Sequence, residues 1–182
     1  VRMVTRTGKP SIATGLAPSV EFRSADANDA AGAAAAVAGA THVYQCAQPP
    51  YHRWPEQFPA LQASILKATA AAGATFVVAE NLYMYGDTHG QPLTEDTPYR
   101  PNTRKGRVRA EMSEALFNAH AQGKVRAVAG RASDFYGPGD LLGERLFLAA
   151  LQGKTANGLG DLDQPHTFSN VEDFGEALVI LG

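Results

Sequence analysis

The stretch that decides the fold is FVVAENLYMYGD, residues 76–87, followed after a polar loop by TRKGRVRAE, residues 103–111. The apolar run over 75–79 predicts a buried strand that ends at a polar, aromatic edge. The second segment opens a helix whose first turns carry four cations: Arg104, Lys105, Arg107 and Arg109. Positive charge at a helix N-terminus is mildly unfavourable, so we expect an anion nearby. That anion is either a ligand or the pair Glu95 and Asp96 with water.

Strands and helices alternate along the rest of the chain. Alternating or apolar runs predict strands at 1–5, 19–26, 41–47, 75–79, 124–130 and 168–171. Amphipathic spacing and closing glycines predict helices at 29–38, 58–72, 103–121, 141–151 and 172–181. This order predicts an α/β fold with a doubly wound parallel sheet. Ligands of such sheets bind beyond the carboxyl ends of the strands.

Composition excludes several classes of protein. The 182 residues suffice for one domain with a real core. A net charge of −2 argues against nucleic-acid binding, and the single cysteine, Cys46, excludes a disulfide framework. No apolar run approaches the roughly 20 residues that span a membrane, and the five histidines lack metal-ligand spacing. We therefore expect a cytoplasmic protein with no membrane, nucleic-acid or metal partner.

Residues at the predicted strand ends fit a dinucleotide, although each has a simpler explanation. Arg6 follows the first strand, where a cation suits a 2′-phosphate and hence NADP, but it is equally a solvated turn residue. Asp26 and small Ala27 follow the second strand, where they suit an adenine edge or a helix cap. The third strand ends in Cys46, Ala47 and Gln48, whose first two side chains allow close approach of a flat ligand or simply pack.

The sequence resembles the short-chain dehydrogenase/reductase superfamily of the extended type, in its NAD-dependent epimerase/dehydratase branch. The segments that carry the resemblance are VRMVTRTG (1–8), SADAND (24–29), HVYQCAQPP (42–50), FVVAENLYMYGD (76–87), TEDTPYRP (94–101), RASDFYGPG (131–139) and FSNVEDFGEAL (168–178). The resemblance implies a Rossmann-like NAD(P)-binding domain over 1–182, with the beginning of a substrate lobe at about 140–182. It also implies an NAD(P)-dependent oxidoreductase or epimerase/dehydratase acting on a small carbonyl, alcohol or sugar-like substrate. Homodimers of the family often form through two long helices, here 58–72 and 103–121.

Two departures from the family matter. The family opens with a strand and a glycine-rich phosphate loop, and nothing before Val1 supplies them. We therefore expect a Rossmann-like sheet that is incomplete at the N-terminus, with a gap at its centre, in a piece of a longer gene product.

The second departure lies in the catalytic residues that the resemblance implies. The family's serine becomes Asn81, and its tyrosine and lysine, four residues apart on one helix face, become Thr103 and Arg107. Threonine cannot act as the acid or base, whereas Arg107 can still hold ribose or phosphate. Tyr83 or Tyr99 could replace the missing tyrosine. Alternative hypotheses are a dinucleotide-binding or regulatory module without redox turnover, and an enzyme for dehydration or isomerisation without net redox.

Overall fold

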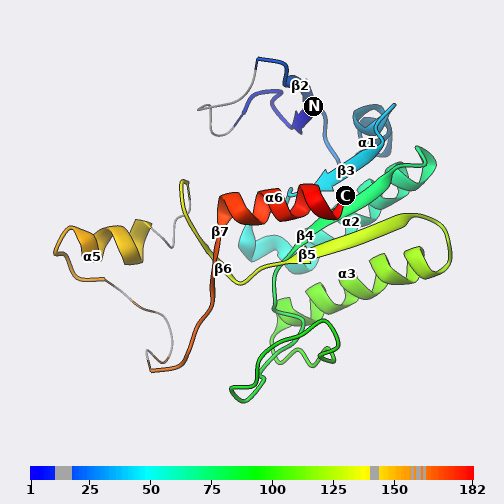
Figure 1. Ribbon diagram of the computed structural model, residues 1–182. Helices are drawn as coiled ribbons and strands as arrows, with labels where there is room; N and C mark the ends of the chain where they lie inside the picture. Colours follow the sequence, from blue (N-terminus) through cyan, green and yellow to red (C-terminus); the bar gives the residue numbers. More distant parts are fainter. Residues whose placement is uncertain (11–17, 140–143, 157, 159–160, 162) are drawn as a thin grey trace.

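The computed structural model describes residues 1–182 except 11–17, 140–143, 157, 159–160 and 162 (Figure 1). Its strands are β1 (Arg2–Thr5), β2 (Glu21–Ser24), β3 (His42–Gln45), β4 (Thr75–Glu80), β5 (Arg126–Arg131), β6 (Asp134–Tyr136) and β7 (Phe168–Asn170). Its helices are α1 (Ala30–Val37), α2 (Trp54–Ala71), α3 (Arg104–Ala121), α5 (Ala149–Leu151) and α6 (Val171–Leu181), with short turns η1 (Tyr51–Arg53) and η2 (Glu144–Leu148). The predicted helix at 141–151 is thus helical from 144 onward, and 141–143 lie outside the described residues.

The core forms around the parallel sheet β3–β4–β5. Successive residues of β4 point to opposite faces, as strand geometry requires. Phe76 and Val78, both fully buried, pack against Phe58 of α2 and Leu116 of α3. The apolar stripes of α2 and α3 therefore cover one face of the sheet.

Helix α6 covers the opposite face of the same sheet (Figure 1). Leu178 of α6 lies so close to Gly130 of β5 that a Cβ on Gly130 would be only 2.7 Å from the Leu178 Cδ2. Val77, between the two core residues of β4, lies beside the end of α6 at Gly182. Helices thus cover both faces of a parallel sheet, which confirms the predicted doubly wound α/β architecture.

The other strands form separate parallel pairs, β1–β2 and β6–β7. In the described part of the chain the strands therefore form three groups, and the separation of β1–β2 from β3–β4–β5 agrees with the expected gap at the centre of the sheet. Arg2 holds the first pair to α1, because its guanidinium donates to the carbonyls of Ala36 and Ala38 at 2.9 and 3.0 Å.

Two boundary predictions were wrong. Helix α2 begins at Trp54, four residues before the predicted start, because Pro55 is tolerated in the first helical turn, where its missing N–H leaves no bond unmade. Residues 134–136, which lie outside every predicted strand, form β6, which pairs with β7 from Asp134 opposite Phe168 to Tyr136 opposite Asn170. Three residues are too few to show alternation, so this strand depends on its distant partner.

Candidate functional site

A buried carboxylate ends the central strand. Glu80, the last residue of β4, has a side chain with no exposed surface. Its Oε2 accepts a hydrogen bond from Arg131 Nε at 3.0 Å and another from Ser113 Oγ at 3.1 Å. Its Oε1 lies 3.7 Å from Arg109 Nη2. Two arginines and a hydroxyl thus compensate a charge that burial would otherwise make very costly, while Oε1 itself accepts no hydrogen bond among the described residues.

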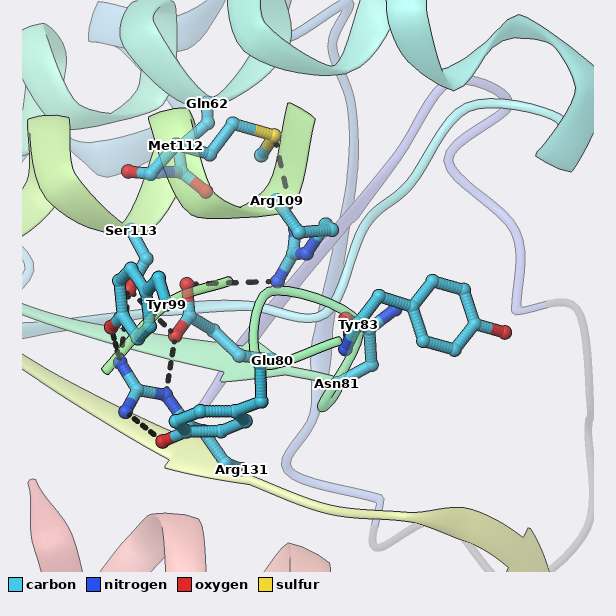
Figure 2. A network of polar contacts seen from close by, with 10 residues as sticks. Gln62, Glu80, Asn81, Tyr83, Tyr99, Arg109, Met112, Ser113 and Arg131 are labelled. Carbon is cyan, nitrogen blue, oxygen red and sulfur yellow. Dashed lines mark hydrogen bonds and ion pairs between the residues drawn. The ribbon is translucent and has the colours of Figure 1, made fainter. Parts of the chain in front are cut away.

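Arg131, the last residue of β5, connects this carboxylate to the loop between β4 and α3 (Figure 2). Its guanidinium donates to Tyr85 Oη at 2.6 Å, to Ser113 Oγ at 2.9 Å and to Tyr99 Oη. Tyr99 Oη also lies 2.9 Å from Ser113 Oγ. Both ends of the 81–103 loop are therefore fixed to β5 and α3 through a planar cation with five donors.

The cations at the start of α3 do not share one anion. Arg109 is buried and faces Glu80, while Arg104 pairs with Glu56 of α2 at 2.9 Å. The ammonium of Lys105 lies 4.1 Å from the centre of the Tyr51 ring. The expectation that Glu95 and Asp96 neutralise the cluster was wrong for these three side chains, because carboxylates on β4 and α2 and an aromatic ring reach them first.

Three of the predicted site residues meet at the start of α3. Thr103 is the N-cap of this helix, and its hydroxyl accepts from the Gly106 N–H at 2.9 Å. A Cβ on Gly106 would lie 2.5 Å from the Tyr83 carbonyl oxygen, so the helix start touches the loop after β4. Asn81 Oδ1 accepts from the Tyr83 N–H at 3.2 Å. Asn81, Tyr83 and Thr103 are thus neighbours, joined by backbone contacts.

The other two predicted catalytic residues lie elsewhere. Arg107 is exposed on the first turns of α3. Tyr99 belongs to the Glu80–Arg131 network, where its hydroxyl already has partners. Tyr83 is different again, because partial burial and the hydrogen bond between its hydroxyl and that of Tyr51, at 3.4 Å, raise the pKa of its phenol. Tyr83 therefore stays protonated at neutral pH and can donate a hydrogen bond.

The predicted cofactor residues lie at the ends of β1, β2 and β3. The pKa of the Asp26 carboxyl is lowered, chiefly by two hydrogen bonds from Asn28. The nearby positive charge of Arg6 is a smaller cause of the same shift. Asp26 Oδ1 accepts a hydrogen bond from the Asn28 N–H at 2.9 Å. The Arg6 side chain is exposed. Ala27 is half-buried and packs against the core.

The end of β3, at the carboxyl edge of the central sheet, presents polar groups and small side chains. Cys46, Ala47 and Gln48 are exposed. Gln45, just before them, is buried, and its Oε1 has no hydrogen-bond partner among the described residues. A buried acceptor without a partner is costly, so a donor group of a ligand at this edge would complete it. The residues present therefore fit a ribose-bearing cofactor.

Sequence reasoning missed the central charges of the site, Glu80 and Arg131. A signal existed, because a glutamate directly after the buried run TFVVA and an arginine directly after RAVAG both close core strands. Parallel neighbouring strands bring such residues to one edge, and β4 and β5 indeed pair Glu80 opposite Arg131. Ser113 gave no signal, because a serine on a helix is usually solvated.

The described helices include none that is long and apolar enough to cross a membrane. Within the same residues, no three or more His, Cys, Asp or Glu side chains gather as a metal site would require.

Solved structures similar to this chain share its fold. A dTDP-glucose 4,6-dehydratase from Streptomyces venezuelae, solved with NAD bound, matches with a TM-score of 0.75 and 20% identity. The match covers 91% of this chain and 56% of the dehydratase chain. MoeE5 in complex with UDP-glucose and NAD matches over 98% and 62% with a TM-score of 0.74 and 25% identity. RMD from Pseudomonas aeruginosa, complexed with NADPH, matches over 87% and 60% with a TM-score of 0.68 and 18% identity. The chain thus spans between 56 and 62% of the length of these three proteins.

Among curated protein sequences, none matches this chain significantly. The sequence profile described as "NAD dependent epimerase/dehydratase family" matches residues 2–181, which is nearly the whole chain. With the parallel fold and the ligand edge described above, this match establishes that the chain belongs to the NAD-dependent epimerase/dehydratase family.

Proposed function

We propose that this protein binds NAD or NADP along the ends of β1, β2 and β3, and that it oxidises or reduces a hydroxyl-bearing or carbonyl carbon of a nucleotide-sugar substrate. The observation that carries the proposal is the buried Oε1 of Gln45 at the end of β3, which has no hydrogen-bond partner among the described residues. The substrate class is supported by MoeE5, which was solved with UDP-glucose and NAD and is 25% identical to this chain.

The cofactor residues have separate roles in this proposal. Ala27, Cys46 and Ala47 leave room for the adenine and ribose, and Gln48 and Arg107 supply polar contacts from the sides. The bound cofactor accepts or returns a hydride. Asn81 donates a hydrogen bond to the substrate oxygen with its amide N–H₂, since its Oδ1 is already an acceptor for Tyr83.

We infer a preference for NADP from Arg6. A guanidinium is suited to a phosphate because it offers parallel N–H donors. Replacing Arg6 by Ala should weaken NADPH binding by about 10- to 100-fold, the equivalent of about 1.5–3 kcal/mol for one charged hydrogen bond. NADH binding should change little, and Arg126→Ala, at the opposite edge of the sheet, is the matched control.

NADPH and NADH fluorescence titrations test the cofactor, and a panel of UDP- and dTDP-sugars with both oxidised cofactors tests turnover. Binding of either cofactor together with turnover of a nucleotide sugar supports the proposal. Absence of cofactor binding refutes it. If turnover survives both Asn81→Ala and Arg107→Ala, the roles of these two residues are refuted.

A second candidate function is a dinucleotide-binding module without redox turnover. The hydroxyl of Thr103, which we place in the slot of the family's tyrosine, accepts the hydrogen bond that caps α3. The raised pKa of Tyr83 keeps the Tyr83 phenol protonated. Tight NADPH binding without turnover on the whole panel would favour this second function.

A further inference from the structure

His166 and Asp134 form a pair that spans two neighbouring strand segments. His166 Nε2 lies 3.0 Å from Asp134 Oδ2. Asp134 begins β6, three residues after the end of β5, and His166 lies two residues before β7. The His166 ring packs edge-on to the Phe168 ring, with centres 4.8 Å apart. The imidazole is therefore held in place from two directions, by a carboxylate and by an aromatic ring.

This position is at the ligand edge of the central sheet, because β6 continues from the carboxyl end of β5. Asp134 also lies near Tyr83. Its negative charge is the smallest of the four causes that raise the pKa of the Tyr83 phenol. The pair thus lies within electrostatic range of the loop that follows β4.

Among the described residues, the only hydrogen bond of His166 is made by Nε2 and none involves the other ring nitrogen, Nδ1. With the Nε2–H donated to the carboxylate, a neutral imidazole carries its lone pair on Nδ1 and accepts a proton there. The hydrogen bond of the carboxylate fixes this tautomer and stabilises the imidazolium once it forms. A histidine whose ring is oriented by a carboxylate is a frequent general base.

Other candidate bases at this edge are less suitable. Thr103 caps a helix, Tyr83 stays protonated, and Tyr99 is bonded to Arg131 and Ser113.

The other histidines also lack this geometry. His89 and Asp87 are 3.6 Å apart, too far for a hydrogen bond, and their side chains are 88% and 63% exposed. His52 lies in η1 and makes none of the described hydrogen bonds. His42 begins β3, and His120, at the end of α3, accepts from the Ala127 N–H at the opposite edge of the sheet.

We propose that His166 is the general base and acid of this enzyme and that Asp134 is its positioning residue. In the oxidising direction the substrate O–H bond breaks and its proton forms a bond with His166 Nδ1. The electron pair left on oxygen forms the carbonyl bond as the adjacent C–H bond breaks, and its hydride passes to the oxidised nicotinamide dinucleotide. In the reducing direction the imidazolium returns the proton to the oxygen. The proposal rests on the redox function proposed above.

The pair is unlike a stability element. Its side chains are 52% and 46% exposed, and ion pairs of that exposure contribute about 0–1 kcal/mol. Variants of either residue should therefore fold, so that a change in activity reports on chemistry.

The first measurement is turnover of UDP-glucose and dTDP-glucose with oxidised cofactor by His166→Ala, with His89→Ala as the matched control. His166→Ala should lose at least 100-fold in kcat, within the 10²–10⁴ typical of general acid–base catalysis, and His89→Ala should keep wild-type kcat. Added imidazole should restore part of the lost activity of His166→Ala, because the half-exposed site admits it. Asp134→Asn should lower kcat with KM unchanged. Undiminished turnover in His166→Ala, or a loss that imidazole does not restore, overturns the assignment.

A second measurement does not depend on activity. Diethyl pyrocarbonate modifies unprotonated imidazoles, and peptide mass spectrometry locates the product. UDP-glucose with NADP should protect His166 and leave His89 unprotected, and equal modification of both overturns the proposal. NADPH titration of the same samples separates the two hypotheses. If the unmodified wild-type protein does not bind NADPH, the proposed function is refuted. If it binds NADPH but His166 is not protected, only the role of His166 as the base is refuted.

Discussion

Replacing Arg131 by Met removes the cation that joins β5 to the buried end of β4. Arg131 donates to Glu80, Tyr85, Tyr99 and Ser113, and its side chain is only 16% exposed. The methionine keeps most of the stem but leaves the Glu80 carboxylate in a site without solvent. Removing one partner of a buried pair typically costs 3–5 kcal/mol. Arg109 remains 3.7 Å away from Glu80, so we expect the low end, about 3 kcal/mol.

Urea unfolding measures this change as a shift in midpoint. For a domain of this size, about 3 kcal/mol also lowers Tm by roughly 6–12 °C. Arg126→Met is the matched control, because Arg126 is exposed at the other end of the same strand, and it should stay within about 0.5 kcal/mol of wild type. The double variant with Glu80→Gln should lose less than the sum of the two single losses, by about 1 kcal/mol or more. A loss below about 1 kcal/mol for Arg131→Met would refute the reasoning.

Two further predictions concern the start of α3. Gly106→Ala should destabilise the protein by about 1–3 kcal/mol, because its Cβ would lie 2.5 Å from the Tyr83 carbonyl, whereas Gly175→Ala, with open space around it, should gain about 0.5–1 kcal/mol; equal effects in urea unfolding would contradict this contact. The pKa of Tyr83 is higher in the folded state than in the unfolded state. The contribution of the protonated phenol to the free energy of unfolding is therefore fully present below the ordinary tyrosine pKa and is lost as the pH rises toward the raised pKa. The unfolding free energy of the wild type should therefore fall relative to Tyr83→Phe above about pH 10, and parallel curves from pH 8 to 11 would count against it.

The sequence predicted the fold well because the signals of its elements are local. The apolar run of β4 and the closing glycines of α2 and α3 depend on neighbours within a few positions. Elements whose formation depends on distant partners were missed or misplaced. β6 exists because β7 pairs with it, and α2 gains its first turn where Trp54 packs into the core and donates to the Pro49 carbonyl at 3.1 Å.

For the site, sequence alone predicted which residues come shortly after which strand: Arg6 after β1, Asp26 after β2 and Asn81 after β4. The resemblance also predicts that Thr103 and Arg107 occupy the slots of the family's tyrosine and lysine, and this assignment stays a prediction. Only the tertiary structure decided which charges meet. Of the cations at the start of α3, it turns Arg109 inward toward Glu80, and it places Arg131 opposite that carboxylate. The physical reason is that charge pairing is set by distances in space after the strands and helices have packed. The sequence marks Glu80 and Arg131 as residues that close core strands, but their register opposite one another, 51 positions apart, depends on that packing.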